Sequence, residues 1–144
     1  MKEVSIYIMV KPDSEMKGYF KGNVFKIGMS ETPEKRLLAV DVQETPVELI
    51  AEYVLNDRDT AYKIEKVIHN ILNCYKLRNE WFYLSTVHLQ IIDNVLVELL
   101  TLECHYHDKS YFTTPKFNTA NVLIHALVEM DKKYIINEPT YITP

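Results

Sequence analysis

The sequence contains little cysteine, and this scarcity excludes whole classes of protein. Only Cys74 and Cys104 are present among 144 residues, and both lie in apolar stretches with helix-like spacing. Small disulfide-built secreted domains need several paired cysteines, and structural zinc sites need four ligands. We therefore expect a protein of the reducing cytoplasm, in which both thiols act as small apolar side chains.

Long apolar runs are also missing. A membrane-spanning helix needs about 20 consecutive apolar residues, and every apolar stretch of this chain is shorter or interrupted by polar residues. Met1, Lys2 and Glu3 lead directly into a strand-like segment, without the apolar core that a signal peptide requires. We expect a soluble, cytoplasmic protein with no membrane partner.

An excess of positive charge is the third absence. The formal net charge is −4 at pH 7, from 16 Lys and Arg against 20 Asp and Glu. A protein that coats nucleic acid electrostatically carries the opposite balance, whereas an enzyme with a local basic cleft is still compatible with it. Residues 86–144 contain 4 basic and 7 acidic residues, so we expect phosphate contacts in residues 1–85.

Three segments of the chain have the composition of β-strands. They are rich in β-branched and aromatic residues, and they are residues 5–10, 23–29 and 47–55. Residues 11–22 are polar and contain Pro12, Gly18 and Gly22, which predicts a loop. The first two strands are therefore expected to form an antiparallel hairpin with a long connection.

Helix signals follow these strands. Thr32 and Pro33 form a capping hydroxyl and a first-turn proline, which predicts a short helix carrying Arg36. Apolar residues at intervals of three and four predict a long helix over about 59–75. They are Ala61, Ile64, Val67, Ile68, Ile71, Leu72 and Tyr75.

The second half of the chain is predicted to be mainly helical. Ser85 or Thr86 can cap a helix that runs through Leu102, and residues 118–136 are predicted as a last helix. The apolar residues of the first of these helices that fall in register are Val87, Ile91, Val95 and Leu99.

These elements describe an α+β protein with a small antiparallel sheet of about three strands flanked by helices. Residues 1–85 are expected to form the main domain. Residues 86–144 are expected to be a helical C-terminal extension that packs on this domain or on a partner. One such partner is a second copy of the chain, which would make a homodimer through the C-terminal helices.

Two tripeptides and three later elements carry a family resemblance. Ser5-Ile6-Tyr7 lies in the first strand, and Lys26-Ile27-Gly28 lies in the second. Arg36 and Glu65 follow on predicted helices, and Asn79-Glu80-Trp81-Phe82-Tyr83-Leu84 follows them. In this order the elements resemble the GIY-YIG nuclease superfamily, in the phage and microbial branch whose second motif is Lys-Ile-Gly. The resemblance spans about residues 4–85.

The resemblance implies a metal-dependent endonuclease that hydrolyses DNA phosphodiester bonds with one divalent ion. It implies that Glu65 is the sole protein ligand of a Mg²⁺ or Mn²⁺ ion, which suits an ion that keeps several waters. Arg36 would stabilise the charge of the phosphate, and Tyr7 would accept a proton from water. Lys26 replaces the tyrosine of the second motif, and its positive charge would lower the pKa of Tyr7.

Each of these side chains also has an ordinary structural interpretation. Glu65 lies at the border of an apolar helix stripe, where a solvated glutamate is common. Arg36 can face solvent from its helix, and Tyr7 can pack on the sheet. Lys26 can protect an edge strand from aggregation. Spacing alone leaves these alternatives open.

His69 is a further candidate catalytic residue, and three other residues are candidates for a supporting role. His69 follows Glu65 by four residues on the same side of the helix, so it can orient water, contact phosphate or share the metal. Gly28 belongs to the second motif. Asn79 and Glu80 occupy the polar position before the aromatic segment, where the resemblance implies a side chain that supports the site.

Nucleic acid is the expected partner, and the form of the DNA is left open between duplex, single-stranded and branched. Lys11, Lys17, Tyr19 and Lys21 decorate the predicted loop, and Lys35 precedes Arg36. Cations interleaved with aromatic residues suit single strands, although a solvated loop has the same composition. The alternative function is a module of the same fold that binds nucleic acid without cleaving it.

Overall fold

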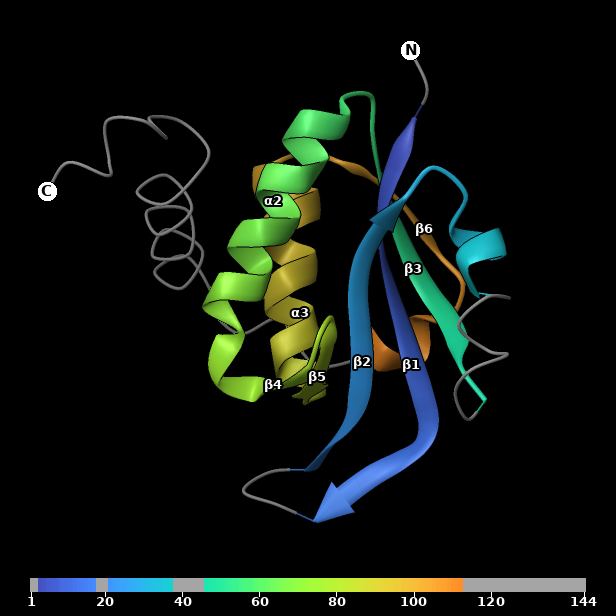
Figure 1. Cartoon of the computed structure of the whole chain (residues 1–144), viewed down its shortest axis with the longest axis vertical. Helices are drawn as coiled ribbons and strands as arrows, with labels where there is room; N and C mark the ends of the chain where they lie inside the picture. Colours follow the sequence, from blue (N-terminus) through green and yellow to red (C-terminus); the bar gives the residue numbers. More distant parts are fainter. Residues whose placement is uncertain (1–2, 18–20, 38–45, 113–144) are drawn as a thin grey trace, which may run out of the picture.

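In the computed structural model of the chain, one six-stranded antiparallel sheet packs against two helices (Figure 1). The structure describes residues 3–17, 21–37 and 46–112. The strand order is β4-β5-β2-β1-β3-β6. The α+β class predicted from the sequence is confirmed, but the sheet has six strands rather than three, because short strands at both edges carry no alternating signal of useful length.

The first hairpin is longer than the sequence predicts. β1 (Val4–Lys17) and β2 (Lys21–Ser30) pair along almost their whole length, so the prediction of a long loop over residues 11–22 is wrong. The register shifts between Lys11 and Met16, and Pro12, which has no N–H to donate, lies inside that irregularity. Within this irregularity, Ser14 Oγ takes the place of a backbone carbonyl and accepts the N–H of Val24 at 2.8 Å.

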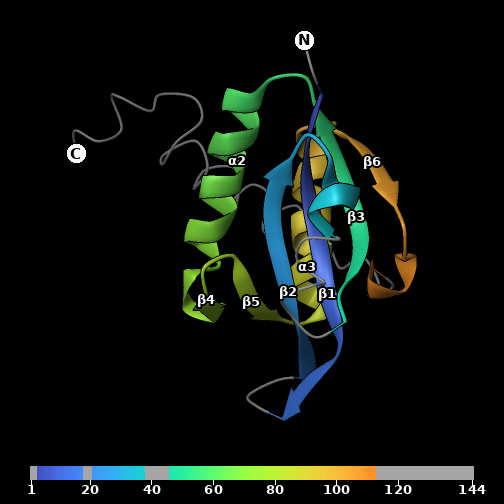
Figure 2. The ribbon, with the colours of Figure 1, turned by 45° about the vertical axis from the view of Figure 1, so that its right-hand side comes forward.

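The two faces of the central strands pack against different parts of the protein. On β1, Ile6 and Ile8 face the main core beneath α2 (Arg58–Ile71) and α3 (Thr86–Asn94). Tyr7 and Met9 alternate to the opposite face, as the two-residue period of a strand requires. There Leu37, in the short helix of residues 33–37, packs beside them, and Figure 2 shows this helix on the far side of the sheet from α2.

Helix α2 follows the sequence prediction closely. Its N-cap is Asp57, whose carboxylate accepts the N–H of Asp59 at 3.2 Å. It buries Ala61, Ile64, Val67 and Ile68, while Ile71 at its end is 43 % exposed. A 3₁₀ turn, η1 (Asn73–Tyr75), leads into β4 (Lys76–Arg78).

The second long helix is shorter than predicted and presents a different face. After α3, the chain forms a π-helical turn, η2 (Val95–Leu99), so the regular helix ends before Leu102. The residues that enter the core are Leu89, Ile92, Val95 and Leu96. The predicted stripe through Val87 is therefore offset, and Val87 is 42 % exposed. The helix is apolar on more than one side, so periodicity alone did not identify the buried face.

Residues after α3 complete the sheet. β3 (Glu48–Leu55) pairs with β6 (Glu103–Tyr106) in antiparallel register, and η3 (Lys109–Phe112) packs against α3. The helix-like spacing around Cys104 was misleading, because Cys104 and Tyr106 alternate inward on a strand. The predicted helix over 118–136 lies outside the described residues. In the described parts, none of the helices combines the length and apolar character needed to span a membrane.

Candidate functional site

The candidate site lies where β5 (Trp81–Leu84) diverges from β2. The two strands pair from Asn23 to Lys26 of β2, and then the N–H of Ile27 donates to the carbonyl of Glu80 at 3.1 Å. On the other side of this point, Nε2 of His69 on α2 lies 2.7 Å from the carbonyl oxygen of Ile27. A strand, a turn and a helix therefore meet at Ile27.

Tyr7 and Gly28 face each other across β1 and β2. Tyr7 is 1 % exposed, and its ring lies directly over the glycine. A Cβ atom on residue 28 would come within 2.6 Å of Cζ of Tyr7 and 2.9 Å of Oε1 of Glu80, closer than real Cβ contacts. Gly28 is therefore required sterically, because it leaves the space that the tyrosine ring occupies.

Lys26 is buried beside Tyr7 on the same face of the sheet. Lys26 is 7 % exposed. Its Nζ lies 3.0 Å from Oε1 of Glu80 and 5.5 Å from the centre of the Trp81 ring. Burial excludes the interpretation of Lys26 as an exposed lysine that protects a strand edge. The ammonium group forms an ion pair with Glu80, which the sequence had assigned only to a supporting place.

Glu65 extends from the border of the buried face of α2 into the same cluster. It is 8 % exposed, and its Oε2 atom is buried without a hydrogen-bond partner. Burial, and then the charge of Glu80, raise the pKa of Glu65 from 4.5 to about 7, against the opposing charges of Lys26 and Lys66. An isolated buried carboxylate is unfavourable, so Glu65 is not the ordinary solvated glutamate of a helix surface.

His69 holds α2 against the sheet. Because the carbonyl of Ile27 can only accept, Nε2 carries the proton of this bond. Burial lowers the pKa of the ring, and the ring packs on Phe82 with centroids 5.0 Å apart. Its Nε2 is 4.0 Å from Oε1 of Glu65, too far for a hydrogen bond. The histidine thus fixes the position of the helix that carries Glu65.

Arg36 approaches Tyr7 from the short helix of residues 33–37, and its side chain is exposed. Burial and the charge of Glu80 raise the pKa of Tyr7 to about 12, with a smaller contribution from Glu65. A side-chain hydrogen bond from Arg36 and its positive charge lower that pKa. The cation that favours the phenolate of Tyr7 is therefore Arg36, whereas the sequence interpretation assigned this role to Lys26.

Asn79 and the outer lysines surround this centre. Asn79 is exposed and has a φ of 47°, a left-handed conformation that asparagine tolerates, so it shapes the turn that presents Glu80. Nζ of Lys11 lies 4.5 Å from the centre of the Trp81 ring. Lys21 and Lys35 are exposed. The side chain of Lys17 and all of Tyr19 lie outside the described residues.

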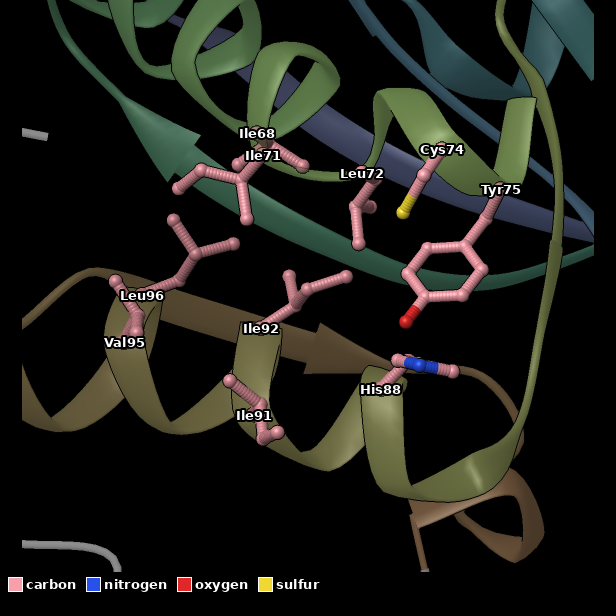
Figure 3. A pocket seen from close by; sticks show the side chains of 10 residues that line it. All are labelled: Ile68, Ile71, Leu72, Cys74, Tyr75, His88, Ile91, Ile92, Val95 and Leu96. Carbon is pink, nitrogen blue, oxygen red and sulfur yellow. The ribbon is translucent and has the colours of Figure 1, made fainter. Parts of the chain in front are cut away.

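A cavity of about 430 Å³ opens beside the two carboxylates. Its lining residues are Met29, Arg58, Asp59, Tyr62, Glu65 and Glu80. A second cavity, of about 270 Å³, lies between α2 and α3 and is lined mainly by apolar side chains, with His88 at one end (Figure 3). The first cavity is lined by the carboxylates of Glu65 and Glu80, whereas the walls of the second carry no carboxylate.

The family assignment agrees with this geometry. The model of the T5orf172 domain family matches residues 5–100. The chain belongs to the T5orf172 domain family. This phage-associated domain is nuclease-like, and the match to the T5orf172 domain contains every site residue from Tyr7 to Glu80. No curated protein and no solved structure matches the chain.

Sequence reasoning gave Glu80 only a supporting place and did not assign two residues of the cavity to the site. Glu80 is in contact with Lys26 and influences the pKa of both Tyr7 and Glu65, although it follows Glu65 by 15 residues. Arg58 and Tyr62 line the cavity and were not considered. The sequence did contain a signal for both residues. Arg58, Tyr62 and Lys66 follow one another at intervals of four residues, and therefore share one face of a helix that the sequence had already predicted.

Proposed function

We propose that this chain is a GIY-YIG-type endonuclease that hydrolyses DNA phosphodiester bonds with one divalent metal ion. The proposal rests mainly on the burial of the Glu65 carboxylate. Its buried carboxylate has one oxygen without a partner, and it lies in the cluster that also holds Tyr7, Lys26 and Arg36. A protein that needed only stability would gain from an apolar residue at this position.

The residues present fit a magnesium or manganese ion held mainly by other ligands. The unpartnered oxygen of Glu65 supplies one protein ligand. Among the described residues, no group of three or more His, Cys, Asp or Glu side chains could hold a metal, so water and substrate oxygens would complete the shell, as Mg²⁺ prefers. When bound, the ion would stabilise negative charge on the phosphate and on the departing oxygen.

The residues of the chain itself would bind phosphate and move a proton. Arg36 is exposed on one side and interacts with Tyr7 on the other, so its guanidinium can hold a phosphate next to the tyrosine hydroxyl. Tyr7 Oη would take the proton of the attacking water as the phenolate, after the phenol has lost its own proton to solvent. Since Glu80 and Glu65 raise the pKa of Tyr7, positive charge brought beside these carboxylates favours that transfer.

Cleavage of supercoiled plasmid tests the proposal. We expect the wild type to nick plasmid with Mg²⁺ or Mn²⁺ and not with EDTA. The Glu65→Gln variant should lose at least about 100-fold in rate, as other stabilisers of transition-state charge do. Glu103→Gln is the matched control, because Glu103 is exposed on β6 and pairs with His105, and it should cleave like the wild type.

Two results would contradict the proposal in different ways. Equal nicking by wild type and Glu65→Gln would mean that Glu65 is not part of the reacting site. DNA binding without cleavage by either protein would support the alternative, a nucleic-acid-binding module of the same fold. The high pKa of Tyr7, which keeps its hydroxyl protonated at neutral pH, is the feature that favours this alternative.

A further inference from the structure

The outer face of α2 carries a cation, an aromatic ring and a second cation in line. They are Arg58, Tyr62 and Lys66, and residues four apart on a helix lie on one face, about 6 Å apart along its axis. Arg58 and Tyr62 line the cavity that also holds Glu65 and Glu80. None of the three has a place in the reaction described above.

Tyr62 is the centre of this stripe. Its side chain is 52 % exposed, so core packing does not account for a large aromatic residue here. Nζ of Lys66 lies 5.9 Å from the centre of its ring, within the range of a cation–π interaction. An exposed ring with neighbouring positive charge is the arrangement on which proteins stack the bases of single strands.

Arg58 can exchange its ion pair with Glu31 for a contact with a phosphate. Its Nη1 lies 3.3 Å from Oε2 of Glu31, and the two side chains are 64 % and 39 % exposed. Such exposed ion pairs contribute little to stability, and a phosphate offers the same guanidinium two charged oxygens. Asp59 also lines the cavity, and its negative charge would repel a phosphate placed beside it. Binding on this face therefore depends on stacking as well as on charge.

We propose that this stripe binds an unpaired nucleotide next to the phosphate that is cleaved. The base stacks on Tyr62, and the flanking phosphates contact Arg58 and Lys66. In a continuous duplex both faces of a base are covered by its neighbours, so the substrate contains an unpaired base, as in a single strand, a flap or a junction. The inference deepens the proposed function and rests on it for the place of the cleaved bond.

Binding without cleavage tests the stripe directly. Fluorescence anisotropy in EDTA would compare labelled single strands of DNA and RNA with a blunt DNA duplex. We expect Tyr62→Ala to weaken single-strand binding by about 5- to 150-fold, the effect of removing one stacked base, and to change duplex binding little. Tyr62→Trp should restore single-strand binding. Equal weakening of single-strand and duplex binding would overturn the inference.

Lys66→Ala and Lys109→Ala form a matched pair. Each lysine lies over a tyrosine ring, Lys66 over Tyr62 at 5.9 Å and Lys109 over Tyr106 at 5.0 Å. Only Lys66→Ala should weaken binding. Weaker RNA than DNA binding by the wild type would identify DNA as the source of the unpaired nucleotide, and the reverse would identify RNA. In either case the dependence on Tyr62 decides the inference.

The inference and the proposed function can fail separately. A wild type that cleaves, with a Tyr62→Ala variant that binds and cleaves single strands equally well, would remove the stripe and leave the nuclease. A wild type that binds unpaired strands through Tyr62 and never cleaves would leave the stripe and remove the nuclease. A single strand containing 5-iodouracil should crosslink at Tyr62, and a crosslink confined to other tyrosines would also overturn the inference.

Discussion

At the scale of single residues, the site is a balance of buried charges. Lys26 and Glu80 neutralise each other at 3.0 Å, whereas Glu65 is buried with one unpartnered oxygen. The fold therefore opposes the ionisation of Glu65, which raises its pKa to about 7. Such a conflict between stability and charge is typical of functional positions.

The pKa of Glu65 predicts how stability depends on pH. The group has a pKa of 4.5 in the unfolded chain and about 7 in the folded protein, so between these values the folded state holds a proton that the unfolded state has lost. Stability falls as pH rises through this window. We expect Glu65→Gln to match wild type below pH 4.5 and to be the more stable above pH 7, in urea unfolding with EDTA.

The control for this experiment is again Glu103→Gln, which should follow the wild type at every pH because Glu103 is exposed. Adding Mg²⁺ above pH 7 should stabilise the wild type and not Glu65→Gln, since a ligand stabilises only the state that binds it. If Glu65→Gln and wild type had the same stability across the whole range, Glu65 would not be the strained group that we describe.

At the scale of elements, the start of α3 is built from two side chains. Ser85 Oγ accepts the N–H of His88, at 3.4 Å, and the N–H of Ser85 donates to Nδ1 of His88 at 3.0 Å. This capping box orients the helix whose residues Leu89, Ile92 and Leu96 enter the core. Burial lowers the pKa of His88, so Nδ1 stays unprotonated at neutral pH and can accept.

Removing the cap should destabilise the protein by a modest amount. We expect Ser85→Ala to lower the free energy of unfolding by about 1 kcal/mol, the usual contribution of an N-cap hydroxyl, and Ser85→Thr to retain most of it. Urea unfolding at neutral pH measures both. The wild type should also lose stability as pH falls through the lowered pKa of His88, because protonated Nδ1 cannot accept the N–H of Ser85.

At the scale of the whole molecule, residues after 85 share the core of the residues before them. β6 pairs with β3, and α3 fills the main core. Asp93 on α3 accepts hydrogen bonds from Tyr53 on β3 and Tyr106 on β6, both at 2.7 Å. This network joins a helix to two strands of the sheet, so the three elements should unfold together.

This connection predicts the outcome of truncation. A chain that ends at residue 85 would lack Leu89, Ile92 and Leu96, which are at most 7 % exposed, and we expect it to show no cooperative thermal transition by circular dichroism. Loss of even one buried leucine costs about 2–5 kcal/mol. The full-length chain is the control and should show the transition. A folded product ending at residue 85 would instead support the domain boundary predicted from the sequence.

Local patterns in the sequence were sufficient for the elements with strong local signals. The apolar stripe of α2 identified that helix, and composition rich in β-branched and aromatic residues identified the cores of β1, β2 and β3. The hairpin was misjudged because a proline inside a strand pair looks like a loop residue until the partner strand is known. The homodimer predicted through the C-terminal helices and the cytoplasmic location stay predictions.

Motif and order along the chain are enough to identify the side chains available to the site and the elements that carry them. Tyr7, Lys26, Arg36 and Glu65 were identifiable from motif and order. How the charges of these side chains interact depends on the folded chain. Two contacts join distant parts of the chain: the pairing of Lys26 with Glu80 and the closeness of Arg36 to Tyr7. The same packing buries one oxygen of Glu65 without a partner. Electrostatic energies depend on distance and burial, which local periodicity does not encode.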